Sequence, residues 1–173
     1  MAVIRFGHLG ICVSSLAVSV PFYRDLLGFR TLTQVEVKGA DADKLLGLSG
    51  VDQTTVFVER DGVRLALFEF RSPKLSPERM HEPGEARTTG RMSDVRQMNV
   101  PGMAAIMLRV DDIEATLVRI RAASVQVFDE TRTDYPEYGS RLVFVADPDG
   151  TLIELVEIPG DPYAPFGKPY TGP

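Results

Sequence analysis

Apolar and polar residues follow each other along this chain in two successive rounds that predict the same elements. The first round, residues 1–70, opens with a strand at 3–13 and a helix whose apolar residues recur on one face: Leu16, Val20, Tyr23 and Leu27. Pro21 predicts a bend in that helix, and Gly28 predicts its end. Further strands are predicted at residues 30–37, 54–59 and 63–70, with a short helix at 40–48.

The second round, residues 102–158, repeats this order. A strand at 103–110 leads to Asp111-Asp112, which predicts a helix cap. The apolar residues of that helix again share one face: Ile113, Leu117 and Ile120. A strand at 125–131 precedes a hairpin at 142–158, whose turn is the Asp-Pro-Asp-Gly of residues 147–150. We therefore predict an α+β fold of two βαβββ modules, offset by 97 residues at the first helix and by 88 at the last hairpin.

Two segments fall outside these rounds. Residues 71–101 are polar, contain several prolines and glycines, and show no sustained period, so we predict a long connector that acts as a lid or binding loop. Residues 159–173 combine prolines with Tyr163, Phe166 and Tyr170. Proline at this density keeps the segment out of helices and sheets, and the aromatic residues favour an arm that docks on a surface.

Charge and cysteine content limit the partners and the location. A net charge of −5 over 173 residues, without a basic cluster, argues against nucleic acid or an anionic membrane as a partner. No apolar run approaches the roughly 20 residues that span a bilayer. Arg5, His8 and Arg24 interrupt the apolar start of the chain, which argues against a signal peptide. Cys12 is the only cysteine, so no internal disulfide forms, and we expect a reducing, cytoplasmic location.

Four stretches of the chain carry a family resemblance. They are residues 6–11 (FGHLGI), 22–29 (FYRDLLGF), 108–113 (LRVDDI) and 147–155 (DPDGTLIEL). Together they resemble the vicinal oxygen chelate superfamily of glyoxalase I, methylmalonyl-CoA epimerase, extradiol dioxygenases, fosfomycin-resistance proteins and bleomycin-binding proteins. The resemblance implies that the two modules form curved sheets around a shared pocket. It also implies a divalent metal ion, held by the first and last strands of each module, that acts as a Lewis acid on substrate oxygens.

The ligand positions of this family match the chain only in part. His8 matches the first-strand ligand of the first module, and Glu154 matches the last-strand ligand of the second. The two remaining positions hold Ala105 and Ala66. Because catalytic sites usually supply three or more protein ligands, we expect no metal or a weakly bound divalent ion. Two alternatives could add a ligand: a β-bulge that turns Glu69 inward, or His81 reaching in from the connector.

Other candidate residues lie near the second module. Tyr135 and Tyr138, in the loop before the last hairpin, could contact substrate or pack on each other at the surface. Arg109 could bind a substrate carboxylate, although a subunit interface or an ion pair with a neighbouring aspartate is the stronger interpretation. Met107 belongs to a group of methionines that either pack in the core or line an adaptable apolar pocket.

Two functions from different classes fit these features. The first is an isomerase, epimerase or lyase that acts on an oxygen-bearing or CoA-linked small molecule, with Glu154 as proton acceptor and His8 as its partner. The second is a non-catalytic protein that sequesters a drug-like or hydrophobic metabolite. Retained His8 and Glu154 favour the first, and the alanines at positions 66 and 105 favour the second or a reaction without metal. We also expect a homodimer, because the aromatic arm needs a surface on which to bury its rings.

Overall fold

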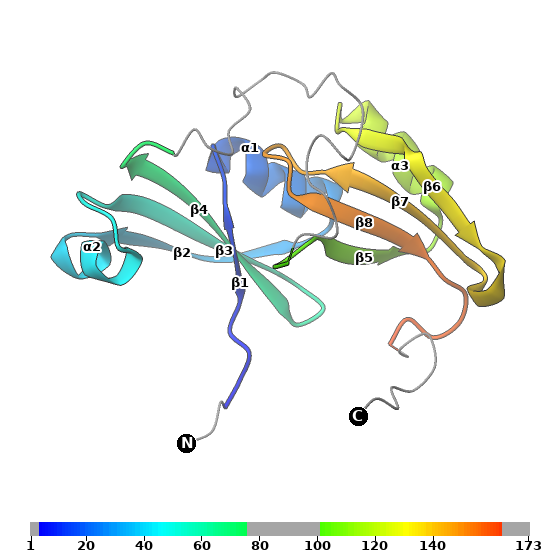
Figure 1. The fold of residues 1–173 in the computed structure, drawn as a ribbon, viewed down its shortest axis with the longest axis horizontal. Helices are drawn as coiled ribbons and strands as arrows, with labels where there is room; N and C mark the ends of the chain where they lie inside the picture. Colours follow the sequence, from blue (N-terminus) through cyan, green and yellow to red (C-terminus); the bar gives the residue numbers. More distant parts are fainter. Residues whose placement is uncertain (1–3, 76–100, 164–173) are drawn as a thin grey trace. The chain divides into compact units, whose positions relative to one another are not determined.

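Two four-stranded sheets with the same strand order form the framework of this protein (Figure 1). The computed structural model describes residues 4–75 and 101–163, and the chain divides into two units, Met1–Glu85 and Ala86–Pro173. The first sheet has the order β1-β4-β3-β2 and the second the order β5-β8-β7-β6. In each sheet the first strand runs parallel to the last, and the other pairs are antiparallel. The predicted α+β fold of two βαβββ modules is confirmed.

The first unit follows the predicted order of elements. It contains β1 (Leu9–Cys12), α1 (Leu16–Pro21), the π-helical turn η1 (Phe22–Leu26), β2 (Arg30–Lys38), α2 (Ala40–Leu46), β3 (Asp52–Arg60) and β4 (Val63–Ser72). The predicted bend at Pro21 is confirmed, because α1 ends there and the chain continues as η1. Gly28 follows the C-cap with a φ of +74°, as a helix-ending glycine does. The first strand is shorter than predicted, because β4 starts at Val63 and pairs with β1 from Leu9 onward.

The second unit repeats the order of strands along the chain, with the short turn η4 in the place that α2 has in the first unit. It contains β5 (Ile106–Val110), α3 (Ile113–Ala122), β6 (Val127–Tyr135), the 3-10 turn η4 (Pro136–Tyr138), β7 (Ser140–Ala146) and β8 (Leu152–Glu157). Asp112 caps α3 as predicted, since its carboxylate accepts a hydrogen bond from the Ala115 amide at 2.9 Å. The placement of Tyr135 in a loop is wrong. β6 extends to this residue because Tyr135 pairs with Ser140 of β7.

The hairpin between β7 and β8 closes through the carboxylate of Asp147. Its Oδ1 accepts hydrogen bonds from the Asp149 amide at 3.0 Å and the Thr151 amide at 2.6 Å. Gly150 takes a φ of +86°, and its amide donates to the Asp147 carbonyl. The sequence prediction of a tight turn at this position is confirmed. Asp147 itself is buried, so the turn is part of the packed structure and not a loose surface loop.

Each sheet buries one face against its own helix. Side chains alternate between the two faces of a strand, and the fully buried Val58, Leu65 and Leu67 share one face of the first sheet, where α1 contacts β3 and β4. In the second unit, Ile153 and Leu155 of β8 occupy the corresponding face, where α3 contacts β8. By strand register, the opposite face of the second sheet carries Glu154, Met107 and Arg109.

A glutamate from the last strand of each sheet binds the start of the helix. The Glu69 carboxylate accepts a hydrogen bond from the Leu16 amide at 2.7 Å, and the Glu157 carboxylate accepts one from the Ile113 amide at 2.8 Å. Glu157 also pairs with Arg141 at 2.6 Å. These bonds satisfy amides that have no partner within the helix. The hydrogen bond from the Ile113 amide is the largest cause that lowers the pKa of Glu157 below its usual value.

Replacing Glu157 with Gln is expected to lower the free energy of unfolding by about 1 kcal/mol at neutral pH, as for loss of a helix cap. Because the pKa of Glu157 is lowered in the folded protein, its contribution is present above the ordinary carboxyl pKa and is lost as the pH falls through the lowered value. Urea unfolding at several pH values measures this. The exposed Glu137→Gln serves as the control. A Glu157→Gln deficit that grows toward acid pH would contradict the assignment.

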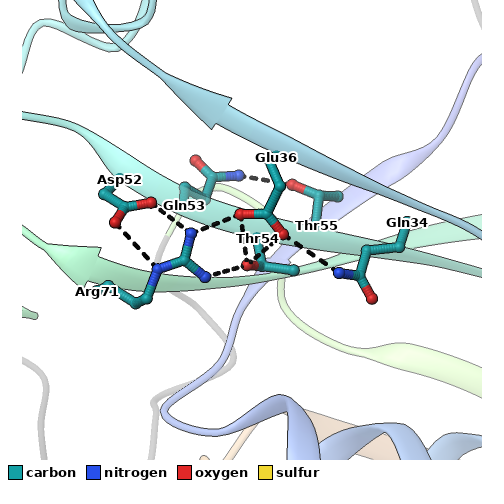
Figure 2. A network of polar contacts seen from close by, with 7 residues as sticks. All are labelled: Gln34, Glu36, Asp52, Gln53, Thr54, Thr55 and Arg71. Carbon is teal, nitrogen blue, oxygen red and sulfur yellow. Dashed lines mark hydrogen bonds and ion pairs between the residues drawn. The ribbon is translucent and has the colours of Figure 1, made fainter.

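Polar side chains around Arg71 hold the end of β4 (Figure 2). The Arg71 guanidinium donates hydrogen bonds to Asp52, Glu36 and the hydroxyl of Thr54. Hydrogen bonding from Arg71 is the largest cause that lowers the pKa of both carboxyl groups. The network joins β2, β3 and β4 where the chain leaves the first sheet. Because these groups are exposed, their mutual attraction weakens in salt.

Parts of the predicted organisation lie outside the described residues. Residues 76–100, with His81, make up most of the predicted connector, and 164–173 make up most of the predicted arm. The boundaries 1–70, 71–101, 102–158 and 159–173 therefore stay predictions. Within the described ranges, no helix is both long enough and apolar enough to cross a membrane.

Candidate functional site

Strand register places the predicted ligand positions of the two sheets in correspondence. In the first sheet Gly10 of β1 pairs with Ala66 of β4, and in the second Met107 of β5 pairs with Glu154 of β8. Adding 97 takes Gly10 to Met107, and adding 88 takes Ala66 to Glu154. The offsets that relate the sequence motifs thus also relate the hydrogen-bonded strand pairs. Ala66 is therefore the counterpart of Glu154.

Glu154 lies in the middle of β8, between Met107 of β5 and Phe144 of β7. Its side chain is half-buried and forms no hydrogen bond or ion pair with any residue that the structure describes. Burial raises the pKa of the Glu154 carboxyl, because nothing replaces the water that the charged form loses. An unpaired carboxylate with a raised pKa is a stronger base than an ordinary carboxylate, which suits it to proton transfer.

The surface beside Glu154 is apolar and partly open. Met107 is 48% exposed, and Tyr135, which lies on the same sheet face by strand register, is 44% exposed. Ala105 and Phe144 pack against a buried cluster on this face, formed by Phe128, Ala146 and Leu152. Tyr138 lies in the η4 turn after β6 and is 49% exposed. A carboxyl in this setting has apolar side chains within reach that could hold the body of a small molecule.

His8 lies directly before β1 and is exposed. Its ring makes an edge-to-face contact with Phe57, with ring centroids 5.3 Å apart. Phe57 pairs across the sheet with Ala66, which is only 2% exposed. The ring of Phe68 covers Gly10, where an added Cβ would lie 2.9 Å from a ring carbon. Around Ala66 the first sheet therefore presents aromatic side chains and one imidazole.

The donor groups that the structure describes in each unit do not fit a tightly held metal ion. His8 is the one matching ligand of the first unit and Glu154 the one of the second, with Ala66 and Ala105 at the other positions. The alternative in which a bulge turns Glu69 inward is not what the structure shows, because β4 pairs regularly with β3 from Val63 to Phe70 and Glu69 binds the start of α1. Residues 4–75 and 101–163 contain no group of three or more His, Cys, Asp or Glu side chains that could hold a metal.

Arg109 binds the main chain that follows β8. Its guanidinium donates to the carbonyl oxygens of Asp161 at 2.9 Å, Gly160 at 3.0 Å and Pro159 at 3.2 Å, and to the carbonyl of Ile158. The expected ion pair with Asp111 or Asp112 is not what the structure shows. A role of Arg109 in binding a substrate carboxylate stays a prediction, and it would require these contacts to break.

Sequence reasoning missed three features of this region. The paired helix caps of Glu69 and Glu157 could have been found, because the two glutamates are related by the same offset of 88 as Ala66 and Glu154. Neither the Arg109 contact nor the ring of Phe68 over Gly10 has such a signal. Both depend on the path of a side chain across a neighbouring strand or turn.

Comparison with known proteins finds a family and structures that have a fold similar to this one. Residues 5–155 match the family described as Glyoxalase/Bleomycin resistance protein/Dioxygenase superfamily. The uncharacterized protein YaeR of Escherichia coli K12 is 30% identical over 151 residues, which cover 87% of this chain and 93% of YaeR. A glyoxalase family protein from Bacillus cereus has a similar fold, with a TM-score of 0.72, 20% identity, and coverage of 92% of this chain and 97% of that one.

The trypanothione-dependent glyoxalase I of Leishmania major is a more distant structural relative. Its TM-score is 0.54 at 21% identity, with 87% of this chain and 84% of that chain covered. At such identities the solved structures show a shared fold and nothing more about activity. The match of the family model covers most of the sequence, including Glu154 and nearly all of both sheets. The chain therefore belongs to the glyoxalase/bleomycin resistance protein/dioxygenase superfamily.

Proposed function

We propose that this protein is an isomerase, epimerase or lyase for an oxygen-bearing or CoA-linked small molecule, with Glu154 as the proton acceptor. The observation that carries the proposal is the half-buried Glu154 carboxyl, which has no partner among the described residues and lies between Met107 and Phe144. A carboxyl held only for stability would be expected to have a hydrogen-bond or ion-pair partner. An unpaired one can be retained for chemistry.

The chemistry assigned to Glu154 is removal of a proton beside a carbonyl group. The C–H electron pair moves toward the carbonyl carbon, the carbonyl oxygen takes the charge, and the proton is held on the Glu154 carboxyl. Return of that proton to another atom gives an isomer, and departure of a leaving group gives a lyase product. Apolar neighbours such as Met107 and Phe144 favour this transfer because they raise the basicity of the carboxylate.

His8 is proposed as the partner of Glu154 in this reaction. Support comes from the sequence match at the first strand and from its place on the same face of the first sheet as Ala66. The two residues belong to different units, so their joint action stays a prediction. Alanine replacement of His8, measured together with the Glu154 variant in a double-mutant cycle, tests it.

Deuterium uptake is the direct test of the proposed reaction. The protein is incubated in D2O with ketones, 2-hydroxy ketones and thioesters, and loss of the C–H signal next to the carbonyl is followed by NMR. Exchange faster than in buffer supports the proposal. The absence of exchange for all three classes would favour the second candidate, a protein that binds and sequesters an apolar metabolite. The aromatic surface around Ala66 supports that candidate.

Dialysis against zinc, nickel or manganese chloride, followed by desalting and elemental analysis, is expected to leave far less than one metal ion per chain. The reason is the donor set, since Ala66 and Ala105 stand at two of the expected ligand positions. His8→Ala and Glu154→Gln are the matched variants, and neither should change the result. One tightly held equivalent that both substitutions remove would contradict this prediction and would imply a further ligand such as His81.

Light scattering of the full-length protein is expected to give the mass of a homodimer. The proposed reason is the predicted arm of residues 159–173, in which Tyr163 is 87% exposed within the described residues and offers a ring for a partner subunit to cover. A chain that ends at Pro159 should shift toward the monomer mass. A full-length monomer at the highest concentration measured would rule this out. The proposed location is the cytoplasm, on the basis of the single cysteine.

A further inference from the structure

The arginines that the structure describes in the second unit lie mostly with α3 and the sheet face that α3 covers. In residues 101–163 the cationic side chains are five arginines: Arg109, Arg119, Arg121, Arg132 and Arg141. Arg119 and Arg121 belong to α3 itself, and Arg121 pairs with Asp129 at 2.5 Å. Arg132 pairs with Glu114 of α3, and Arg141 pairs with Glu157 on the helix-covered face. By strand register, Arg109 alone of these five shares the sheet face of Glu154.

Arg109 is already bound to the protein's own backbone. Both terminal nitrogens of its guanidinium donate to carbonyl oxygens of residues 158–161, as described above. Hydrogen bonds from a charged donor are stronger than those between neutral groups. A ligand carboxylate would have to displace several of them at once. Arg109 is therefore a poor anion receptor, although its position on the strand next to Met107 suggests one.

The other described groups on this face either repel an anion or form no ionic interaction with it. Glu154 carries the negative charge when ionised, and its neighbours Met107, Phe144 and Ala105 offer no charged donor. As far as residues 101–163 are concerned, a ligand carboxylate placed here would face the Glu154 carboxylate without a cation between them. Repulsion between two such charges at contact distance is a large effect in a partly buried site. An uncharged carbonyl group escapes this repulsion and can accept a hydrogen bond when Glu154 is protonated.

We infer that the Glu154 face selects uncharged carbonyl compounds, such as ketones, amides, esters or thioesters, and rejects free carboxylates and phosphates. This inference rests on the proposed function for the location of the site, and it adds the charge of the substrate group that lies beside Glu154. A CoA-linked substrate fits only if its thioester, and not its phosphates, lies at Glu154.

The test uses an isosteric pair of probes, 3-phenylpropanamide and 3-phenylpropionate, which differ in charge but hardly in shape. Binding to the full-length protein at pH 7.5 is measured by NMR titration. The amide is expected to bind about tenfold or more tightly than the carboxylate, given the repulsion between unit charges. Glu154→Gln should bring the two affinities together by strengthening carboxylate binding, whereas Glu157→Gln, on the opposite face, should leave the ratio unchanged.

Three results would overturn the inference: equal binding of the two probes, tighter binding of the carboxylate, or no amide binding at millimolar concentration. If the carboxylate binds more tightly, the Arg109→Met variant identifies the cause. Carboxylate binding is lost in this variant if Arg109 releases the backbone and acts as the receptor. Binding needs no turnover, so the result is separate from the proposed reaction. Selective amide binding without deuterium exchange would support the inference and refute the enzyme.

Discussion

Replacing Glu154 with Gln is expected to lower turnover roughly 100-fold or more while ligand binding survives, as for loss of a general base. The amide of glutamine keeps the shape of the side chain between Met107 and Phe144 but cannot take a proton from carbon. The measurement is the initial rate of deuterium uptake or product formation with the best substrate from the NMR screen. Both kcat and KM are determined, because loss of a proton acceptor should appear in kcat.

Glu157→Gln is the matched control for this experiment. Glu157 lies three residues further along β8, and its side chain faces α3 instead of the site. The control costs some stability but should leave kcat within about twofold, since general-base loss acts only at the reacting proton. Equal rates for Glu154→Gln and the wild type would refute Glu154 as the proton acceptor. A parallel loss in both variants would indicate damage to the fold.

The Glu154→Gln variant can also be tested without a substrate, through its effect on stability. Because burial raises the pKa of Glu154, folded protein binds its proton more tightly than unfolded protein does. Its contribution to stability is therefore greatest below the unfolded pKa and falls as the pH rises through the folded value. Glu154→Gln should be more stable than the wild type at pH 7, and the difference should vanish in acid. Thermal melts at pH 4 and pH 7 measure this, and a destabilised variant at pH 7 would show a hidden partner for the carboxylate.

Replacing Asp147 with Ala is expected to have the largest effect on stability, a loss of about 3 kcal/mol. One buried carboxylate oxygen accepts from the amides of Asp149 and Thr151, so its removal leaves two donors of the turn without a partner. The turn connects β7 to β8, and a loosened turn would also disturb the strand that carries Glu154. Urea unfolding monitored by circular dichroism gives the change in the free energy of unfolding.

The Asp147→Asn variant shows how much of the stabilisation comes from the negative charge of Asp147 and how much from the hydrogen bonds that its oxygen accepts. Asparagine keeps an oxygen at the Oδ1 position and should restore a large part of the loss, since neutral hydrogen bonds are weaker than charged ones but still satisfy the amides. Glu137→Ala, at an exposed position of the η4 turn, should change stability by less than about 0.5 kcal/mol. Equal stability of Asp147→Ala and the wild type would show that the turn closes without its carboxylate.

Features that follow from neighbouring residues were predictable from the sequence. The Asp-Pro-Asp-Gly turn, the cap at Asp112, the bend at Pro21 and the end at Gly28 each depend on residues within one turn of chain. The order of strands followed from the repeat. Because these local signals occur in both modules, they predicted the fold and the correspondence between position 66 of the first module and position 154 of the second.

Features that depend on distant partners were not predictable in the same way. β1 is short because of where β4 begins, and β6 is long because Tyr135 meets Ser140 of β7. The guanidinium of Arg109 finds carbonyl oxygens some fifty residues away in the sequence. For the site, the sequence named Glu154 and His8 as candidates, and their roles stay predictions. It did not predict that Glu154 has no partner among the described residues, since that depends on every side chain around it.

In each unit the helix that follows the first strand, α1 or α3, has its first amide bound by a glutamate from the last strand of the same unit. Glu69 lies 53 residues beyond the amide it binds, and Glu157 lies 44 residues beyond its own. Every contact that completes the first sheet and its helix is thus encoded before residue 73, ahead of the second sheet during synthesis. A unit that closes on itself in this way can be duplicated as a block. The copies can then diverge at single positions, as Ala66 and Glu154 have, while the paired caps keep both halves able to fold.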